Sequence, residues 1–325
     1  MSVRFATIGT SVITRNFAAA TRLSGRATIT VAHSRDRLRA QQFAAEIGAG
    51  RGESDLEAVL SAADVDAVYV ASPNTAHAEH ARAALAAGKH VLCEKPLVFT
   101  AAQAQELFDL ARDRGVVLLE AMRSAFDPGM AAIRELLPTL GPVRLANLRY
   151  VQRSSRYERV LAGERVNIFD PAVGGGALFD LGVYVASPCV DLFGEPQTVT
   201  SAPIELPTGA DAAGVIVAGY PGLVATLTYS KITASALPSE IQGEAATLVI
   251  DHISRPRRLR VEPLGSEPVE HVVDGTLDAG EDVDGNLAYE VVAFADLVES
   301  GQWPEGPTAR SLGAARLIDA ARAAG

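Results

Sequence analysis

The sequence has few cysteines, no long apolar run and little lysine, and each shortage excludes a class of protein. Two cysteines, Cys93 and Cys189, are too few for a disulfide framework, and both stand among apolar residues, so we expect reduced core residues. No apolar stretch approaches the roughly 20 residues that a membrane-spanning helix needs. The first expected strand, residues 3–8, begins next to the initiator methionine, so we expect no signal peptide and a cytoplasmic protein.

Negative charge outweighs positive charge, with a formal net charge of −10 at pH 7. A nucleic-acid-binding surface needs a basic patch or stripe, so we expect a small-molecule substrate as partner, and neither nucleic acid nor membrane. Among the 29 Lys and Arg residues, lysine occurs only at Lys89, Lys95 and Lys231. Arginine keeps its proton at every workable pH, so a lysine in such a chain indicates a need for a titratable ammonium.

The first part of the chain alternates short apolar segments with helical patterns. Strands are expected at residues 3–8, 28–32, 67–70, 91–93 and 116–119. Strand and helix alternating in this way predict a doubly wound parallel sheet of the α/β class, a Rossmann fold. We place this dinucleotide-binding domain at residues 1–122.

After residue 122 the pattern changes to β-rich segments. A helix is expected at 128–137, strands at 143–152, 215–218, 223–228, 247–250 and 259–261, and helices at 287–300 and 311–324. We expect a C-terminal α+β domain over residues 123–325, with a mainly antiparallel open sheet covered on one face by a helix at 176–192 and the C-terminal helix free to pack back on the first domain. The strands carry more apolar residues than one buried face requires, so the open face is expected to form a homodimer or homotetramer.

A degraded glycine motif follows the first strand. Gly9 matches the first glycine of G-x-G-x-x-G, whereas Ser11 and Thr14 occupy the places of the second and third. A strand, a glycine turn and a helix N-terminus together form a candidate pyrophosphate site, although an ordinary strand-to-helix turn is the alternative. The candidate contacts are Gly9, Thr10, Ser11, Val12 and Ile13.

The end of the second strand should decide which dinucleotide binds. An acidic residue there would accept from a ribose 2′-hydroxyl, but this chain has Ser34 and Arg35, a hydroxyl and a guanidinium suited to a 2′-phosphate. The sequence therefore favours NADP, with NAD as the alternative. In the competing interpretation Asp36 caps the next helix and the arginines line its solvated face.

Residues 88–96 read as a helix stop at Gly88, a buried strand, and the triplet Glu94, Lys95, Pro96. Ligands bind at the carboxyl ends of the strands of an open α/β sheet, so Lys95 is expected to face a ligand. The alternative is that Lys95 forms a surface ion pair with Glu94.

Three segments together resemble a known family. They are SPNTAHAEHARAALAAGKHVLCEKP at 72–96, GGGALFDLGVY at 174–184 and YEVVAF at 289–294. The chain resembles the Gfo/Idh/MocA oxidoreductases, the family of glucose-fructose oxidoreductase and inositol dehydrogenase. The resemblance implies an NAD(P)-dependent oxidoreductase that moves a hydride between a nicotinamide cofactor and a hydroxyl or carbonyl of a sugar, polyol or cyclic diol.

The resemblance also implies cofactor contacts in the first segment. They are Ser72, Pro73, Asn74, His77, Glu94 and Lys95, with Asn74 and His77 on the nicotinamide side. His77 and His80 share one helix face, but no third ligand stands at a recognisable spacing, so we expect no metal.

The second segment supplies the expected catalytic groups. Asp180 and Tyr184 are four residues apart, which places them on one helix face, and with Lys95 they form a trio suited to alcohol–carbonyl interconversion. A nearby cation lowers the pKa of a phenol, so Tyr184 is expected to exchange the proton, Lys95 to activate it and Asp180 to tune the pair. A tyrosine at this place resembles the branch of glucose-fructose oxidoreductase and dimeric dihydrodiol dehydrogenase. The alternative is that Tyr184 is a core aromatic and Asp180 a helix cap.

The substrate remains open at the level of sequence. Expected contacts are Lys95, Arg123, Asn167, Asp180 and Tyr184, with Arg153, Arg156 and Arg165 as further candidates. Relatives often carry histidine before the proline where this chain has Asp127 and Pro128, which leaves the substrate undetermined. The rival hypothesis is a dinucleotide-binding regulator or sensor without turnover, because a fold does not fix a function.

Overall fold

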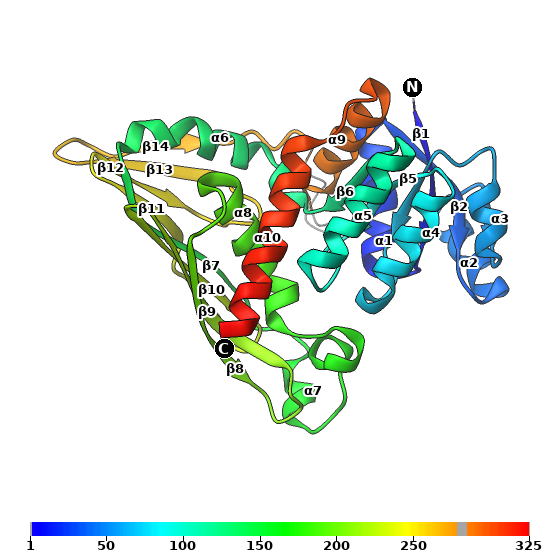
Figure 1. Ribbon diagram of the computed structural model, residues 1–325, viewed down its shortest axis with the longest axis horizontal. Helices are drawn as coiled ribbons and strands as arrows, with labels where there is room; N and C mark the ends of the chain where they lie inside the picture. Colours follow the sequence, from blue (N-terminus) through cyan, green and yellow to red (C-terminus); the bar gives the residue numbers. More distant parts are fainter. Residues whose placement is uncertain (1, 278–284, 325) are drawn as a thin grey trace. The chain divides into compact units, whose positions relative to one another are not determined.

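The computed structural model describes residues 2–277 and 285–324 (Figure 1). The chain divides into two compact units, Met1–Arg123 with Thr276–Ala309, and Ser124–Gly275 with Arg310–Gly325. The sequence pattern divides the chain once, near residue 122, whereas the structure returns residues 276–309 to the first unit.

Unit 1 contains a six-stranded sheet in which every neighbouring pair is parallel. Its order is β3 (Arg51–Glu53), β2 (Ala27–His33), β1 (Val3–Ile8), β4 (Ala67–Val70), β5 (His90–Glu94) and β6 (Leu118–Ala121). This order and direction confirm the doubly wound parallel sheet.

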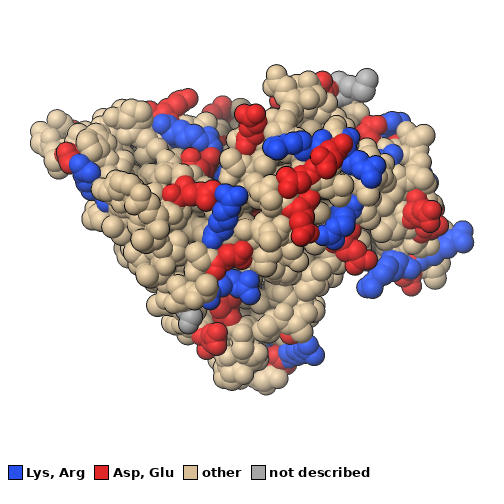
Figure 2. All heavy atoms as spheres, viewed as in Figure 1, with Lys and Arg blue, Asp and Glu red and all other residues tan. Residues whose placement is uncertain are grey.

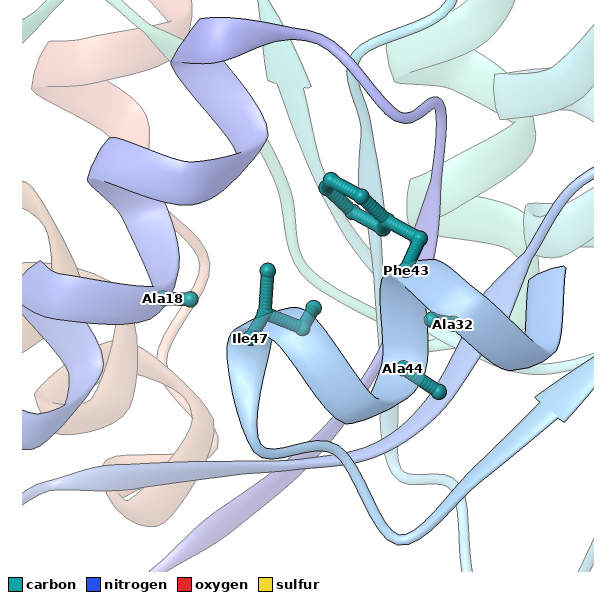
Figure 3. Close-up of a cluster of buried hydrophobic side chains, with 5 residues drawn as sticks. All are labelled: Ala18, Ala32, Phe43, Ala44 and Ile47. Atoms are coloured by element: carbon teal, nitrogen blue, oxygen red, sulfur yellow. The ribbon is translucent and has the colours of Figure 1, made fainter. Parts of the chain in front are cut away.

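The helices of unit 1 are α1 (Val12–Ser24), α2 (Arg37–Ile47), α3 (Leu56–Ser61), α4 (His77–Ala86), α5 (Ala101–Arg114) and α9 (Leu287–Ser300), with a short turn η1 (Asn74–Ala76). Small residues let α1 and α2 approach β2, as the cluster of Ala18, Ala32, Phe43, Ala44 and Ile47 shows (Figure 3). α9 packs on α1, and the Phe294 ring lies 5.3 Å from that of Phe5. The YEVVAF segment is therefore part of the core of unit 1.

Unit 2 contains an eight-stranded mixed sheet. Its order is β14 (Val269–Val272), β13 (Arg258–Pro263), β12 (Ala246–Ile250), β11 (Ser239–Gly243), β7 (Val143–Val151), β10 (Leu223–Ser230), β9 (Asp211–Tyr220) and β8 (Thr198–Glu205). Neighbours are antiparallel except β7 and β10, which are parallel. The sequence expectation of a mainly antiparallel sheet is confirmed, but it lacked β8, β11 and β14, whose polar and proline residues hide the strand pattern.

The remaining elements are η2 (Arg123–Phe126), α6 (Pro128–Leu136), η3 (Leu137–Leu140), α7 (Tyr157–Leu161), η4 (Asn167–Phe169), η5 (Pro171–Val173), η6 (Leu178–Gly182), α8 (Val183–Phe193) and α10 (Glu305–Ala324). η6 and α8 pack against β7 and β10, so they cover one face of the sheet, as expected. Strand register places five exposed apolar side chains on the other face, over β7 to β10: Leu145, Ile204, Val215, Val217 and Val224.

Charged side chains of both signs are interleaved on the surface that Figure 2 shows. The ion pairs of unit 1 include Arg4 with Asp66 and Arg26 with Asp296. Cys93 and Cys189 are buried free thiols, as expected. None of the helices within the described ranges has the length and hydropathy of a transmembrane segment.

Candidate active site

The turn after β1 forms a close backbone approach. Gly9 has a φ of 118°, and a Cβ on it would lie 2.2 Å from the Ala71 carbonyl oxygen, so no other residue fits there without moving the backbone. Ser11, in an extended conformation, is the N-cap of α1, which begins at Val12 and has no acidic residue in its first turn. The N-terminus of α1 thus keeps its positive dipole end without a competing carboxylate, which suits a phosphate group.

Arg39 of α2 reaches back to this turn. Its Nε donates to Thr10 Oγ1 at 3.3 Å and its Nη2 to the Thr10 carbonyl at 3.1 Å, while its guanidinium lies 5.4 Å from the centre of the Phe43 ring. Asp36 caps α2 by accepting from Arg39 N at 2.8 Å. The competing interpretation is therefore right about the cap, but Arg39 belongs to the glycine turn and not only to the solvated face of α2.

Ser34 and Arg35 lie in the loop between β2 and α2. The Arg35 side chain is exposed, and the strand before it ends in His33 and not in a carboxylate. A hydroxyl and exposed guanidinium with no acid at the strand end form a donor set for a phosphate. The residues present therefore fit the phosphorylated dinucleotide.

His77 joins the loops that follow β4 and β5. Its Nδ1 lies 2.8 Å from the Pro96 carbonyl oxygen and its Nε2 2.9 Å from the Ser72 carbonyl oxygen, and the side chain is 1% exposed. Burial lowers the pKa of His77, and the charge of Lys95 lowers it further, although the two carbonyls oppose this. The ring is thus a buried link between the SPN turn and the Lys95-Pro96 segment, whose peptide bond is cis. The other predicted cofactor residues of this turn, Pro73 and Asn74, lie at the start of η1.

The imidazole of His80 faces Ser72, with Nδ1 at 2.9 Å from the serine Oγ. Within the described parts of the chain, no three His, Cys, Asp or Glu side chains are grouped so that they could hold a metal ion.

Two buried carboxyl groups of unit 1, those of Glu94 and Glu290, interact electrostatically. Tyr69 donates to Glu94 Oε1 at 2.5 Å, and the Lys95 amide donates to Oε2 at 3.3 Å. Glu290 of α9 is fully buried, and neither of its carboxyl oxygens has a hydrogen-bond partner among the residues that the structure describes. Burial and the charge of Glu94 raise the pKa of Glu290 well above its usual range, against the effect of Arg123. Burial and the Glu94 charge both disfavour the ionised form of Glu290.

Arg123, a predicted substrate contact, acts electrostatically on both carboxyls. Burial raises the pKa of Glu94, whereas the Tyr69 hydrogen bond, Lys95 and Arg123 lower it. The Arg123 charge therefore acts on two buried acids of unit 1, Glu94 and Glu290.

The glycine block of unit 2 is packed against the segment that carries Asn167. A Cβ on Gly175 would lie 2.3 Å from the Asn167 carbonyl oxygen, and Gly176 N donates to the Ile168 carbonyl at 3.1 Å. Two predicted features, Asn167 and the GGGALFDLGVY segment, are brought together in this way. The Asn167 side chain itself is exposed.

The segment continues as η6, one turn of π-helix, before α8 begins. Leu178 N donates to Asp211 Oδ2 at 2.7 Å, which fixes the first residue of this turn to β9. Single π turns next to α-helices are frequent at functional sites. The expected regular helix over 176–192 is therefore corrected to a π turn followed by α8.

Asp180 lies in the π turn and is paired with a lysine that the sequence pattern left without a role. Lys231 Nζ lies 2.7 Å from Asp180 Oδ2, and their side chains are 3% and 38% exposed, respectively. The sequence hypothesis connected Asp180 with Lys95 and Tyr184, because the spacing of residues in a helix does not reveal a partner on a distant strand.

Tyr184 is 5% exposed and lies on α8. Its ring meets that of Tyr150 edge to face at 5.2 Å, and Tyr150 meets His252 in the same way at 5.1 Å. Packing of this kind fixes the direction of the phenol, as a positioned proton donor requires.

The three other candidate arginines belong to the surface of the loop before the glycine block. Arg153 pairs with Glu158 at 2.8 Å, and Arg165 pairs with Asp170 while its side chain stays 75% exposed. Arg156 is exposed, and its amide donates to Ser154 Oγ at 3.2 Å.

Comparisons with known proteins agree with this geometry. Residues 3–122 match the family model described as an oxidoreductase family with an NAD-binding Rossmann fold, and residues 131–249 match that of the GFO/IDH/MocA C-terminal domain. The scyllo-inositol 2-dehydrogenase (NADP(+)) IolU of Bacillus subtilis (strain 168) is 37% identical over 324 residues, covering 98% of this chain and 96% of that protein. The D-xylose 1-dehydrogenase (NADP(+)) 2 of Haloferax volcanii is 31% identical over 292 residues, covering 88% and 86%.

A solved structure matches the whole chain. It is KijD10, a 3-ketoreductase from Actinomadura kijaniata, in complex with NADP and TDP-benzene, with a TM-score of 0.86, 28% identity and coverage of 100% of this chain and 98% of that one. Variants of KijD10 solved with the same ligands carry alanine or glutamate in place of a lysine, and phenylalanine in place of a tyrosine.

Proposed function

Because this chain belongs to the GFO/IDH/MocA oxidoreductase family, we propose that it transfers a hydride between NADP and a hydroxyl or carbonyl carbon of a polyol or sugar. The observation that carries the proposal is the donor set of Ser34, Arg35 and Arg39 beside the open N-terminus of α1. Inositol and xylose, on which the relatives act by name, are the first substrates to test, and a cyclic diol is the next.

The cofactor would be held by residues of unit 1. The turn from Gly9 to Ile13 would donate backbone N–H groups to the pyrophosphate, and Ser34 with Arg35 would bind the 2′-phosphate. The nicotinamide side would be formed by Ser72, Pro73, Asn74, His77, Glu94 and Lys95. When bound, the nicotinamide supplies the acceptor or donor of the hydride.

The chain's own residues handle the proton. In the oxidation direction the substrate hydroxyl gives its proton to the Tyr184 oxygen as its carbon loses the hydride, and in the reduction direction Tyr184 returns it. In this proposal Lys95 would supply the positive charge that the proton exchange needs, and Asp180 with Asn167 would hold neighbouring hydroxyls of the substrate. Arg123, whose charge lowers the pKa of both Glu94 and Glu290, would favour the ionised form of Glu94 beside Lys95.

Several hydroxyl-bearing substrates suit this donor and acceptor set. Carboxylates and amides pair well with the multiple hydroxyls of an inositol or a pentose, because each hydroxyl both donates and accepts. A regulator without turnover would not need Lys95, Asp180 and Tyr184 together, so the enzyme is favoured over the sensor. We also propose that unit 2 self-associates through the open face of its sheet, and that the protein works in the cytoplasm, where its two thiols stay reduced.

A substrate panel tests the proposal. Purified protein would be mixed with NADP+ or NAD+ and with scyllo-inositol, myo-inositol, aldopentoses, aldohexoses and a trans-dihydrodiol, and formation of reduced cofactor would be followed by absorbance. We expect turnover of at least one polyol or sugar with NADP+, lost in Tyr184→Phe. Cofactor binding without turnover across the panel in both directions would support the sensor instead.

A further inference from the structure

Each of the chain's three lysines has a different place in the structure. Lys89 Nζ donates to the carbonyls of Ala62 at 2.9 Å and Val65 at 2.7 Å, so it closes the turn between α3 and β4. Lys95 stands at the carboxyl end of β5. Lys231 follows directly after β10, and the chemistry described so far gives it no task.

The ammonium of Lys231 connects separate segments of unit 2. Besides Asp180, it contacts the Ile168 carbonyl oxygen at 3.0 Å and lies 4.9 Å from the centre of the Phe169 ring. Its own backbone carbonyl accepts from Ser154 N at 2.8 Å. One side chain thus joins the end of β10 to the π turn and to η4, the two segments that carry Asp180 and Asn167.

Burial makes these contacts necessary. A buried ammonium is costly unless it is paired and hydrogen-bonded, and this one is 3% exposed. Arginine could not offer the same compact charge, since its planar fork is larger. The need for a compact, paired charge at this buried position therefore explains why an arginine-rich chain has a lysine here. The need for a titratable ammonium is the corresponding reason for Lys95.

The ion pair is asymmetric. Lys231 is enclosed, whereas 38% of the Asp180 side chain is exposed, so the carboxylate is held from its buried side. Asp211 of β9 is the second acid near this ammonium: burial raises its pKa, while the Leu178 amide and Lys231 lower it. The π turn is therefore attached to the sheet at two points, by Leu178 N to Asp211 and by Asp180 to Lys231.

We propose that Lys231 is a positioning residue for substrate binding, which holds the Asp180 carboxylate and the Asn167 segment in the arrangement that receives the substrate hydroxyls. The proposal rests on the proposed function, because it needs Asp180 and Asn167 to contact substrate. It places the effect of Lys231 on the substrate and not on the cofactor, whose expected contacts all belong to unit 1.

Steady-state kinetics separate this role from a merely structural one. Lys231→Met and Lys231→Gln should raise the KM for the polyol or sugar about tenfold or more, the effect of one charge-assisted hydrogen bond, with a smaller fall in kcat. The Kd for NADPH should stay within about twofold. Lys231→Arg, which keeps the charge, should restore part of the KM. Lys89→Met is the matched control, because it removes a lysine held by carbonyls without touching Asp180, so its KM should not change.

A double-mutant cycle tests whether Lys231 acts through Asp180. Lys231→Met combined with Asp180→Asn should be little worse in kcat/KM than Asp180→Asn alone, because the two residues act as one unit. If the losses in kcat/KM of the two single variants multiply in the double variant, the proposal is overturned. An unchanged KM in a folded Lys231→Gln protein would overturn it as well. If Lys231→Met does not fold, the Gln and Arg variants decide, since both keep a donor for the Ile168 carbonyl.

The same four proteins unfolded in urea give a readout that needs no substrate. We expect a coupling between Lys231 and Asp180 in unfolding free energy, and its absence would overturn the pairing itself. If the wild-type protein turned over nothing in the panel, the proposed function would fail while this cycle still decided whether the pair exists.

Discussion

Tyr69 Oη donates a hydrogen bond of 2.5 Å to Glu94 Oε1, and this pair joins the middle of β4 to the last residue of β5 inside unit 1. The bond favours the ionised form of Glu94, whose pKa burial raises. Among the described residues Glu290 has no hydrogen-bond donor, and burial and the charge of Glu94 raise its pKa well above the usual range. Within the described residues, Glu94 therefore has a phenol donor and Glu290 has none.

The raised pKa of Glu290 gives a prediction for stability. A carboxyl whose pKa is raised in the folded state favours folding below its unfolded-state pKa, and this contribution is lost as the pH rises toward the folded-state value. Over that window the wild type should lose about 1.4 kcal/mol per pH unit from this group. Glu290→Gln cannot ionise, so its unfolding free energy relative to wild type should rise as the pH increases from the unfolded-state pKa of a glutamate toward the raised folded-state value.

Urea unfolding at several pH values measures this difference. Glu79→Gln serves as a control, because Glu79 is an exposed glutamate of α4 in the same unit. A constant difference between Glu290→Gln and wild type across the range would mean that Glu290 is ionised when folded.

The parallel sheet was predictable because its strands are continuous apolar runs. Strand β6 shows a limit of this argument. The expected strand, 116–119, lies two residues before the observed one, Leu118–Ala121, because the apolar run stops at Glu120. Its carboxylate is buried and accepts from Leu97 N at 3.0 Å. Burial of that acid depends on a partner 23 residues away, which no local pattern reveals.

The candidate site was predictable only where its residues belong to recognisable sequence motifs. Lys95, Asp180 and Tyr184 stand in recognisable segments, but the Lys231–Asp180 pair joins residues on separate elements, and the π turn changes the spacing on which the one-face argument rested. The scarcity of lysine was the signal that could have identified Lys231. The sequence pattern placed Arg39 on a helix, but its hydrogen bond to Thr10 depends on how α2 packs beside the glycine turn after β1.

Cofactor preference provides the second prediction. Arg35→Ala should weaken NADPH binding about tenfold or more, as expected for a lost charge-assisted contact, and leave NADH binding within about twofold. Arg39→Ala should weaken both, because Arg39 also holds the Thr10 turn. Fluorescence titration of both dinucleotides measures this.

Arg37→Ala is the matched control, since Arg37 is an exposed arginine at the start of the same helix. Equal affinities of the wild type for NADPH and NADH would contradict the assignment of Ser34 and Arg35 to the 2′-phosphate.

The open face of the unit 2 sheet gives the third prediction. Its apolar side chains gather over β7 to β10, whereas Arg260, Glu262 and Glu270 form ion pairs on β13 and β14. A dimer should therefore bury the apolar half. Val217→Lys should shift the protein toward monomer in light scattering at micromolar concentration without loss of folding, because Val217 is already 37% exposed.

Leu264→Lys, at a more exposed apolar residue outside the strands, should not change the mass. A wild-type protein of monomer mass under these conditions would argue against self-association.

The last prediction concerns the proton. Tyr184→Phe removes one oxygen and keeps the ring that packs on Tyr150, so the fold and the affinity for NADPH should be preserved. Loss of a positioned acid–base group should lower kcat about a hundredfold or more. Lys95→Met should be at least as damaging, and the double variant little worse than either single one, because groups that act as a unit are not additive.

Tyr220→Phe is the control for loss of a phenol in unit 2. Its hydroxyl donates to the Gly194 carbonyl at 3.1 Å and belongs to no predicted site, so kcat should stay near that of the wild type. If Tyr184→Phe retained most of the activity on a confirmed substrate, Tyr184 would be a packing residue. Multiplying losses for Lys95→Met and Tyr184→Phe would instead show two independent contributions, and the lysine would then act on the substrate without the phenol.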